Sequence, residues 1–461
     1  MTAVETTQPA ATTEASAPRV PLRTPIVLTA FALLGVLLLV VFGRSGTSVF
    51  NFTASNAGAI QLPVLAMPGR ATSAVVAVIA VIMAGGSWAF ARTQRRTPLW
   101  YVSIFAVVLV TGFLVWASTG IPHELHLTGL LVGALGLSAP LIFGSLGGVI
   151  SERVGVTNVA IEGQLLAGAF VSAVTATVTH SILAGILAAA VAGVLVSFVL
   201  AVFAIKYVVN QVIIGVVLNT LVAGLTTFLY QQVLLNNISA LNHPQLLKQF
   251  AIPGLSLIPI IGPLLFDQNA IVYFMYFAVA AVTIGLFRTR WGLRLRAVGE
   301  HPQAADTVGI NVGRTRFWNV ALAGAIVGIG GSYFTVGNIG PFGANMTNGA
   351  GYIALAAVIF GGWHPIRATL ASLLFGFATN LGSVLGSIQS PVPNEFLLML
   401  PYLVTIFAVA GLVGRVRGPA AAGRPCIPVL PPGQARDSEL LARGAGAGAR
   451  LPGPGREAGR G

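Results

Sequence analysis

Residues 288–316, RTRWGLRLRAVGEHPQAADTVGINVGRTR, form a basic segment between two long apolar stretches in a chain that is otherwise almost free of charge. Within it, the His301-Pro302 pair can begin a helix, the following residues favour one, and Gly309 ends it. The sequence therefore predicts a short helix displayed on a polar loop, which is a suitable element for docking to another protein. The segment holds six of the 25 Lys and Arg residues, namely Arg288, Arg290, Arg294, Arg296, Arg314 and Arg316.

The overall composition indicates a protein that lies in a membrane. Hydrophobic residues make up 55% of the 461 residues, charged residues make up 8%, and the mean hydropathy is +0.86. Apolar runs of about twenty residues recur, and each is long enough to cross a hydrocarbon layer of about 30 Å. Glycines four residues apart, such as Gly324 and Gly328, allow helices to approach closely in lipid. We therefore predict an all-α polytopic membrane protein.

The apolar runs divide the chain into four parts. Residues 1–25 form a cytoplasmic tail that we expect to be disordered, and residues 417–461 form a second, basic tail of the same kind. Between the tails we expect about twelve transmembrane helices, with three additional spans in residues 26–120 and a nine-helix core in residues 125–416. The predicted spans are 26–42, 71–91, 98–117, 128–150, 158–179, 182–205, 210–234, 270–287, 317–336, 349–363, 368–388 and 395–414.

The distribution of cationic residues predicts the orientation of these spans. With the N-terminus in the cytoplasm, all but three of the 25 Lys and Arg residues lie on the cytoplasmic side, the exceptions being Arg44, Arg70 and Lys248. An excess of cations on cytoplasmic loops is the usual bias of membrane proteins, so both termini and the 288–316 loop are expected there. The net charge of +13 reports this orientation and does not indicate binding to nucleic acid.

A second informative segment, residues 139–170, places polar side chains inside apolar sequence. Glu162 follows Asn158 by four residues, which puts both on one face of a predicted helix. A carboxylate is costly beside lipid and usually faces the bundle interior or a wet cavity. Gly155 and Gly163 favour an interrupted helix, the device by which transporters offer backbone groups to a solute. Asn158 and Glu162 are thus candidates for a solute pathway, and a structural bond to a neighbouring helix is the alternative for Glu162.

Three blocks, in order along the chain, resemble the ABC-importer permeases that serve nucleoside and simple-sugar importers. The block GGVISERVGVTNVAIEG at 147–163 is similar to the family signature Ser-Glu-Arg-x-Gly-Val-x-Asn-Ile-Gly-x-Glu-Gly, with Ala160 in place of Gly. The block at 303–309 resembles Glu-Ala-Ala-x-x-x-Gly, with Gln303 in place of Glu. The third block is GAGYIALAAVIFGGWHP at 349–365. The resemblance covers about 125–423, so the three N-terminal spans lie outside the usual importer-permease core.

The resemblance implies a role for the short helix of the basic loop. In the family this is the coupling helix, which sits in a groove of a cytoplasmic ATPase. The family also implies a second permease subunit and an extracytoplasmic substrate-binding receptor as partners. Carried over residue by residue, the ATPase-coupling positions are Gln303, Ala304, Ala305, Asp306 and Gly309.

Amide side chains within the spans are weaker candidates for the solute pathway. Gln211 and Asn219 are eight residues apart and roughly share a face of the span predicted at 210–234. Neutral amides can bond the hydroxyls and ring nitrogens of a nucleoside without the desolvation cost of a charge. Amides equally bond between helices in membranes, so both roles stay open for these two residues and for Asn380.

The chain contains no motif for chemistry of its own. A phosphate-binding loop needs Lys followed by Ser or Thr, whereas Lys206 and Lys248 are followed by Tyr and Gln. The single cysteine, Cys426, excludes an internal disulfide and a cysteine metal cluster. We therefore predict no catalytic residue, metal ligand or cofactor, and a membrane enzyme is disfavoured. ATP hydrolysis then has to come from a partner subunit.

These observations predict the membrane-spanning permease subunit of an ATP-driven importer in the plasma membrane of a bacterium. The expected cargo is a nucleoside, with simple sugars as the next class. The expected partners are a cytoplasmic ABC ATPase subunit, a second permease subunit, an extracytoplasmic receptor and membrane lipid. An ion- or proton-coupled secondary transporter is the alternative, and Glu162 is then the candidate carrier of the coupling charge.

Overall fold

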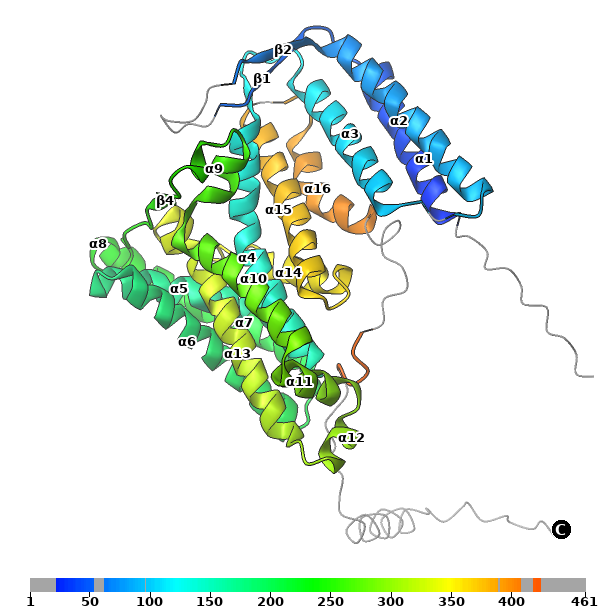
Figure 1. Cartoon of the computed structure of the whole chain (residues 1–461). Coiled ribbons are helices and arrows are strands. Elements are labelled where there is room, and N and C mark those ends of the chain that lie inside the picture. Colours follow the sequence, from blue (N-terminus) through cyan, green and yellow to red (C-terminus); the bar gives the residue numbers. More distant parts are fainter. Residues whose placement is uncertain (1–21, 54–61, 96, 389, 408–417, 424–461) are drawn as a thin grey trace, which may run out of the picture.

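The structure, a computed structural model, describes residues 22–53, 62–95, 97–388, 390–407 and 418–423. Within these residues, ten helices are long and apolar enough to cross a membrane (Figure 1). The chain is therefore an all-α polytopic membrane protein, as predicted. The ten are α1 (Arg23–Val36) with η1 (Leu37–Val41), α2 (Gly69–Arg92), α3 (Leu99–Ser118), α4 (Leu127–Arg153), α5 (Ile161–Thr179), α6 (Ile182–Ala201) with η2 (Val202–Lys206), α7 (Gln211–Leu229) with η3 (Tyr230–Leu234), η4 (Leu235–Asn237) and α8 (Ile238–Leu241), α10 (Ala270–Arg288), α13 (Val312–Ser332) with η6 (Thr335–Ile339), and α15 (Pro365–Ser387).

Shorter elements connect these helices. The short helices are η5 (Leu255–Leu257), α9 (Ile261–Phe266), α11 (Arg290–Glu300), α12 (Pro302–Thr307), α14 (Ala350–Phe360) and α16 (Asn394–Phe407). In one small sheet, β1 (Thr47–Asn51) pairs antiparallel with β2 (Leu65–Pro68) and parallel with β3 (Leu125–His126). In the other, β4 (Gln249–Ala251) pairs antiparallel with β5 (Asp267–Asn269). Both sheets lie in the half of the molecule away from α12 (Figure 1).

Each of the ten long helices lies on a predicted span, and the two remaining predicted spans differ from them. The span predicted at 349–363 is α14, whose 11 residues extend about 16 Å, well short of a hydrocarbon layer of about 30 Å. It follows Gly349 (φ +83°) and stops before Gly362 (φ +61°) and Trp363 (φ +54°), left-handed positions that break a helix. The span predicted at 395–414 contains α16, and its last residues lie outside the described part of the chain.

Helices α4 and α13 lie at the centre of the core. α4 packs against α13, α14, α15 and α10, and α13 also packs against α5 and α6. A Cβ added to Gly193 of α6 would lie 2.0 Å from the Gly324 carbonyl oxygen, and one added to Gly328 would lie 2.1 Å from the Ala189 oxygen. The predicted close approach through Gly324 and Gly328 is therefore confirmed, because only glycine lets the two backbones touch.

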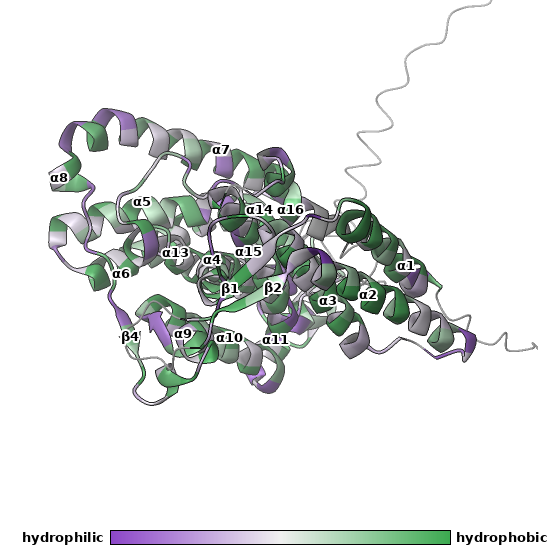
Figure 2. Cartoon of the chain, turned by 90° about the horizontal axis from the view of Figure 1, so that it is seen from above, coloured by the Kyte–Doolittle hydropathy of each residue, from purple (hydrophilic) through white to green (hydrophobic). Residues whose placement is uncertain are grey.

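The three N-terminal helices form a group beside the core. α1, α2 and α3 pack against one another, and α15 and α16 lie between them and the α5–α6 side in both views (Figures 1 and 2). Green, hydrophobic segments dominate the helices of both parts in Figure 2. The group joins the core through the β1–β3 pairing and through an apolar cluster that includes Phe50, Leu114, Leu130 and Leu381.

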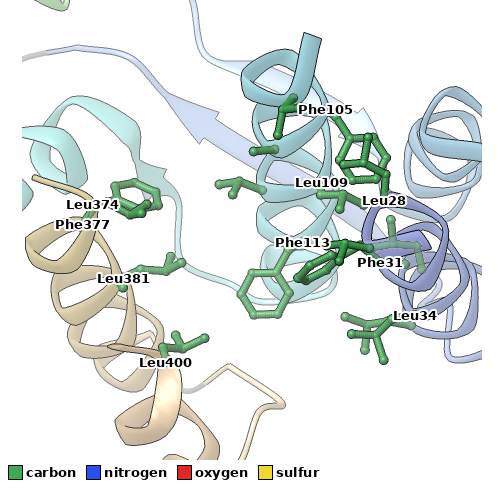
Figure 3. Close-up of a pocket in the computed structure, with 18 of the residues that line it drawn as sticks. Leu28, Phe31, Leu34, Phe105, Leu109, Phe113, Leu374, Phe377, Leu381 and Leu400 are labelled. Carbon is green, nitrogen blue, oxygen red and sulfur yellow. The ribbon is translucent and has the colours of Figure 1, made fainter. Parts of the chain in front are cut away.

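A cavity of about 410 Å³ lies between this group and the core. Leu28 and Phe31 of α1, Phe105 of α3 and Phe377 of α15 line it (Figure 3). Among its lining residues in the described chain, Thr24 alone has a polar side chain. The cavity therefore suits hydrocarbon and offers almost nothing to a polar solute.

Candidate functional site

The middle of the basic loop forms the short helix α12, as predicted (Figure 1). Pro302 occupies its first turn, where a missing amide N–H costs nothing. At its end the Ile310 amide donates to the Ala305 carbonyl (3.0 Å). The Gly309 amide donates to the Asp306 carbonyl (2.9 Å), and Gly309 has a φ of +85°. This is a Schellman ending, which satisfies the last carbonyls and requires a left-handed residue at Gly309.

The residues predicted to couple to an ATPase lie together on α12 and mostly face outward. Gln303, Ala304 and Asp306 are exposed, whereas Ala305 is 3% exposed and belongs to the main core cluster. Gly309 is also exposed, and a Cβ added there would meet nothing within 4 Å. α12 is thus held by one buried side chain and displays the rest of its surface, a geometry that suits docking.

α12 follows α11, which packs directly on the end of α4. A Cβ on Gly299 of α11 would lie 2.0 Å from the Arg153 carbonyl oxygen, so the two backbones touch. The Arg153 side chain donates to the Trp363 carbonyl (2.9 Å) and lies 4.0 Å from the Glu300 carboxylate. The Trp363 indole N–H donates to Glu152. These five residues join the basic loop, the end of α4 and the break before α15, and we call them the junction.

Residues 418–423 of the C-terminal tail pack against the junction. The Ala421 amide donates to the Gly299 carbonyl (2.9 Å), and Ala421 is 4% exposed. A Cβ on Gly418 would lie 2.9 Å from the Trp363 ring. Burial of Ala421 and a backbone hydrogen bond therefore hold residues 418–423, within the predicted tail, against the junction. Residues 424–461 lie outside the described residues.

His364 lies beside the junction at the start of α15. Its imidazole stacks on Phe287 with ring centres 4.8 Å apart. Burial lowers the pKa of His364 below its usual value, and the positive charges of Arg367 and Arg153 lower it further. Its buried Nδ1 has no hydrogen-bond partner among the described residues. The neutral imidazole is therefore the form that fits this position.

Asn158 lies in the turn before α5 and bonds within the protein. It is fully buried, its Oδ1 accepts from the Ala160 amide (3.1 Å), and its Nδ2 donates to Gln164 Oε1 (3.1 Å). Since α5 begins at Ile161, Asn158 is not helical. The prediction that Asn158 and Glu162 share one helical face is therefore wrong, because the chain between α4 and α5 forms turns.

The Glu162 carboxylate holds the start of α14. One of its oxygens accepts from the Thr347 hydroxyl (2.6 Å) and from the Gly349 amide (2.9 Å). The other accepts from the Gly351 amide (2.6 Å). An anion is stabilised at a helix N-terminus, where amides point outward without partners. Glu162 therefore fixes α14 against α5.

The two predicted amides of α7 bond to the same region. Gln211 Oε1 accepts from the Thr157 amide (2.7 Å). Asn219 Oδ1 accepts from the Gly163 amide (2.8 Å), and its Nδ2 donates to the Val159 carbonyl (2.9 Å). Asn219 Nδ2 also lies 3.0 Å from the hydroxyl of Tyr352 in α14.

The structure thus brings the four predicted pathway residues together around the start of α5. All four are buried, and all are bonded to this turn, to α5 itself or to the start of α14. The arrangement supports the structural alternative, in which they fix α5, α7 and α14 relative to one another. Contact with a solute stays a prediction for each of Asn158, Glu162, Gln211 and Asn219.

A larger, polar cavity lies toward the other end of α4. Its volume is about 740 Å³, and it is lined by residues of α4, α15, the α13–η6 helix, the β4–β5 sheet and the segment before β4. Only Asn380 of its lining residues is among the candidates from sequence. In the sequence, the feature that could have identified Tyr333 as a lining residue is its polar hydroxyl within the apolar span predicted at 317–336. The polar lining residues are Lys248, Gln249, Gln268, Asn269, Tyr333, Asn338, Asn380 and Ser383.

The fold and these sites are those of a helical membrane permease, in which long apolar helices surround polar groups and a short helix is exposed at one end. The chain belongs to the family of permease components of the branched-chain amino acid transport system, whose family model matches residues 130–409. It is therefore a transport subunit of the ABC permease class.

Its relatives include permeases of several ABC transporters. The chain is 39% identical over 302 residues to the guanosine ABC transporter permease protein NupQ of Bacillus subtilis, which covers 63% of this chain and 93% of that protein. It is 40% identical over 299 residues to the nucleoside ABC transporter permease protein NupC of Lactococcus lactis, with 62% and 92% covered. It is 32% identical over 307 residues to the putative glucose ABC transporter permease protein TsgC13 of Haloferax volcanii, with 62% and 92% covered. No solved structure matches the chain.

Proposed function

We propose that the chain is the membrane-spanning subunit of an ATP-driven importer for nucleosides, with simple sugars as the next class of cargo. The relatives named for guanosine and nucleosides are 39% and 40% identical to it, and the relative named for glucose is 32% identical. The match covers 92% or more of each of these three relatives, so it extends over nearly the whole of their length.

The observation that carries the ATP-driven part of the proposal is the geometry of α12. Its outer face is exposed in the described part of the chain, Ala305 anchors it, and Gly309 ends it. Through α11 it connects to the contact between Gly299 and Arg153, where no side-chain layer lies between the backbones to absorb a displacement. An ATPase that moves α12 therefore moves the end of α4, and α4 carries the movement into the membrane.

The proposal places the protein in the plasma membrane of a bacterium with both termini in the cytoplasm. The exposed cations Arg288, Arg290 and Arg294 lie at the end of the molecule that carries α12, which supports this orientation. An ABC ATPase subunit then docks on α12, and a second permease subunit completes the transporter. An extracytoplasmic receptor delivers the cargo at the opposite end.

The bonding of Glu162 favours ATP over an ion gradient as the source of energy. A group that carries the coupling charge must exchange its proton or ion during each transport cycle. Glu162 instead accepts three hydrogen bonds from the start of α14, which hold its carboxylate in a fixed structural position. We therefore assign the driving force to a partner ATPase.

Uptake by reconstituted vesicles tests the proposal. The full chain is purified with its ATPase and receptor partners, reconstituted, and supplied with radiolabelled guanosine. We expect uptake that requires ATP and continues when ionophores dissipate the proton and sodium gradients. Uptake that survives ATP depletion but is abolished by ionophores would establish a secondary transporter instead.

A further inference from the structure

Two buried polar groups in the 740 Å³ cavity are open to a ligand. Tyr333 is 6% exposed and Asn380 is 9% exposed, and both line the cavity. Asn380 Nδ2 donates to the Leu130 carbonyl (2.7 Å), which fixes the amide. Within the described part of the chain, neither Asn380 Oδ1 nor the Tyr333 hydroxyl has a hydrogen-bond partner. Neither atom is among the enclosed side-chain atoms that lack a partner, so both open into the cavity, where a solute can bond them.

Glycines of α4 form the wall on which both groups lie. A Cβ on Gly133 would lie 2.8 Å from Asn380 Nδ2, and one on Gly136 would lie 2.8 Å from the Tyr333 hydroxyl oxygen. Any larger residue at either position would displace one of the two groups. Pro140, inside α4, lacks the N–H that would normally donate to the Gly136 carbonyl, so the helix lacks one of its regular hydrogen bonds beside this wall.

The charge of the cavity selects for a neutral cargo. Of the lining residues in the described chain, Lys248 is charged and none is acidic. An amino acid needs an anion for its ammonium group, since an unpaired buried charge is costly. A nucleoside needs hydrogen-bond donors and acceptors, and Tyr333 and Asn380 supply both. Although the family description names branched-chain amino acids, this lining favours a neutral, hydroxyl-rich solute.

We propose that this cavity is the cargo-binding site of the chain and that it holds a nucleoside through the Tyr333 hydroxyl and Asn380 Oδ1. The cargo class in this proposal rests on the proposed function, and the position of the binding site in the protein is the new element. The cavity volume of about 740 Å³ lies within the range of small-molecule sites. The apolar cavity beside α1 offers no comparable set of polar groups.

The proposed site and the docking helix lie toward opposite ends of α4. Gly136, in the cavity wall, and Arg153, in the junction, lie about 25 Å apart along the helix axis. A displacement of α11 against Arg153 therefore acts on the same helix that forms one wall of the cavity, and Pro140 lies between the two points. This places cargo release under the control of α12.

The Tyr333 hydroxyl gives the sharpest test, because it makes no bond within the described structure that the fold would lose. In the reconstituted complex we expect Tyr333→Phe to raise the KM for guanosine uptake roughly 2- to 10-fold, the effect of one lost hydrogen bond, with kcat and ATPase activity unchanged. Tyr276→Phe is the matched control, because its hydroxyl is also without a partner among the described residues but is enclosed outside the cavity lining. An unchanged KM for Tyr333→Phe would overturn the proposal.

A second measurement detects binding without transport. Ser383→Cys, at the cavity, is labelled with a thiol reagent in the full complex without ATP, after Cys426 has been replaced by Ser. We expect guanosine to slow this labelling and to leave Ser387→Cys, one turn further along α15 and outside the cavity lining, unaffected. Glucose and leucine serve as comparison probes. Protection by leucine without protection by guanosine would overturn the assigned cargo class.

The two proposals fail in different ways. If wild-type vesicles take up guanosine with ATP, but guanosine neither protects Ser383→Cys nor depends on Tyr333, the site is overturned and the function stands. If wild-type vesicles show no ATP-dependent guanosine uptake, the function is overturned, and the protection assay still decides whether the cavity binds a nucleoside.

Discussion

The carbonyl oxygen of Arg153, in the last turn of α4, lies 2.0 Å from the position that a Cβ on Gly299 of α11 would occupy. Two helices that are far apart in the sequence thus meet backbone to backbone at the point where the basic loop joins the membrane helices. The Arg153 side chain also donates a hydrogen bond to the Trp363 carbonyl. This one residue therefore connects the end of α4, α11 and the break before α15.

The Gly299 contact predicts a coupling defect. Gly299→Ala must push α11 away from α4, and we expect ATP-driven uptake to fall at least about tenfold while the chain still reaches the membrane. Gly313→Ala is the matched control in the same part of the chain, because a Cβ there meets only Asn311 Oδ1, at 3.8 Å. Wild-type uptake by Gly299→Ala, measured at equal abundance, would contradict the role of the junction.

The ending of α12 predicts a second, distinct defect. A Cβ at Gly309 has free space, but its φ of +85° strains a β-branched side chain by about 1–2 kcal/mol. We expect Gly309→Val to insert normally and to lose uptake and stimulation of the ATPase, because α12 no longer ends in the docking geometry. Gly309→Asn should retain most activity, since Asn tolerates the left-handed region. Equal uptake by the two variants would count against this explanation.

Glu162 is expected to matter for stability. In Glu162→Gln the amide nitrogen faces a hydrogen-bond donor at the start of α14, so we expect a loss of about 1–3 kcal/mol and a lower unfolding temperature in detergent. Glu124→Gln is the control, because Glu124 accepts an exposed hydrogen bond from Asn51. An unchanged unfolding temperature together with an altered cargo preference would instead place Glu162 in the solute pathway.

His364 predicts a loss of stability in acid. Its pKa is lowered in the folded protein, so at mildly acidic pH the unfolded chain binds the proton more readily than the folded one. The stability that the neutral ring contributes is complete above about pH 6.5 and is lost as the pH falls through the lower folded value. We expect the unfolding temperature to fall less on acidification in His364→Phe, which keeps the stacking on Phe287. Parallel pH profiles for the two proteins would refute this role.

The orientation predicts which sites a membrane-impermeant thiol reagent reaches in intact cells. With Cys426 replaced, single cysteines near Arg95 and at 302–306 should be protected from reagent added outside, and one near Gln245 should react. Permeabilised cells control for the reactivity of each site. Labelling of the 302–306 site in intact cells would reverse the orientation.

Local features of this fold could be predicted from the sequence, because short segments determine them. Hydropathy summed over about twenty residues located the ten long helices, and Pro302 and Gly309 located α12. Hydropathy alone missed the shortness of α14, since Trp363 is apolar although its left-handed backbone breaks the helix.

The partners of buried polar groups could not be predicted in the same way. An apolar neighbourhood shows that Glu162 needs hydrogen bonds, but its partner Thr347 lies 185 residues away and only the packing of α5 against α14 brings it close. The polar lining of the larger cavity could not be predicted either, because Tyr333 and Asn380 belong to separate spans that meet only through their packing on α4. The contact of Ala421 with Gly299 likewise joins residues that are far apart in the sequence.

The glycine contact between α6 and α13 restricts how this protein can acquire a new specificity. Where Gly193 meets Gly324 and Gly328 meets Ala189, a larger residue would part the helices before it could create a new contact. Substitutions at this contact between α6 and α13 are therefore disfavoured. If the cavity is the cargo site, as we propose, adaptation to another solute proceeds at lining positions such as Ser383. A change of cargo then requires substitutions among the residues that line the cavity, while the glycine contact between α6 and α13 stays the same.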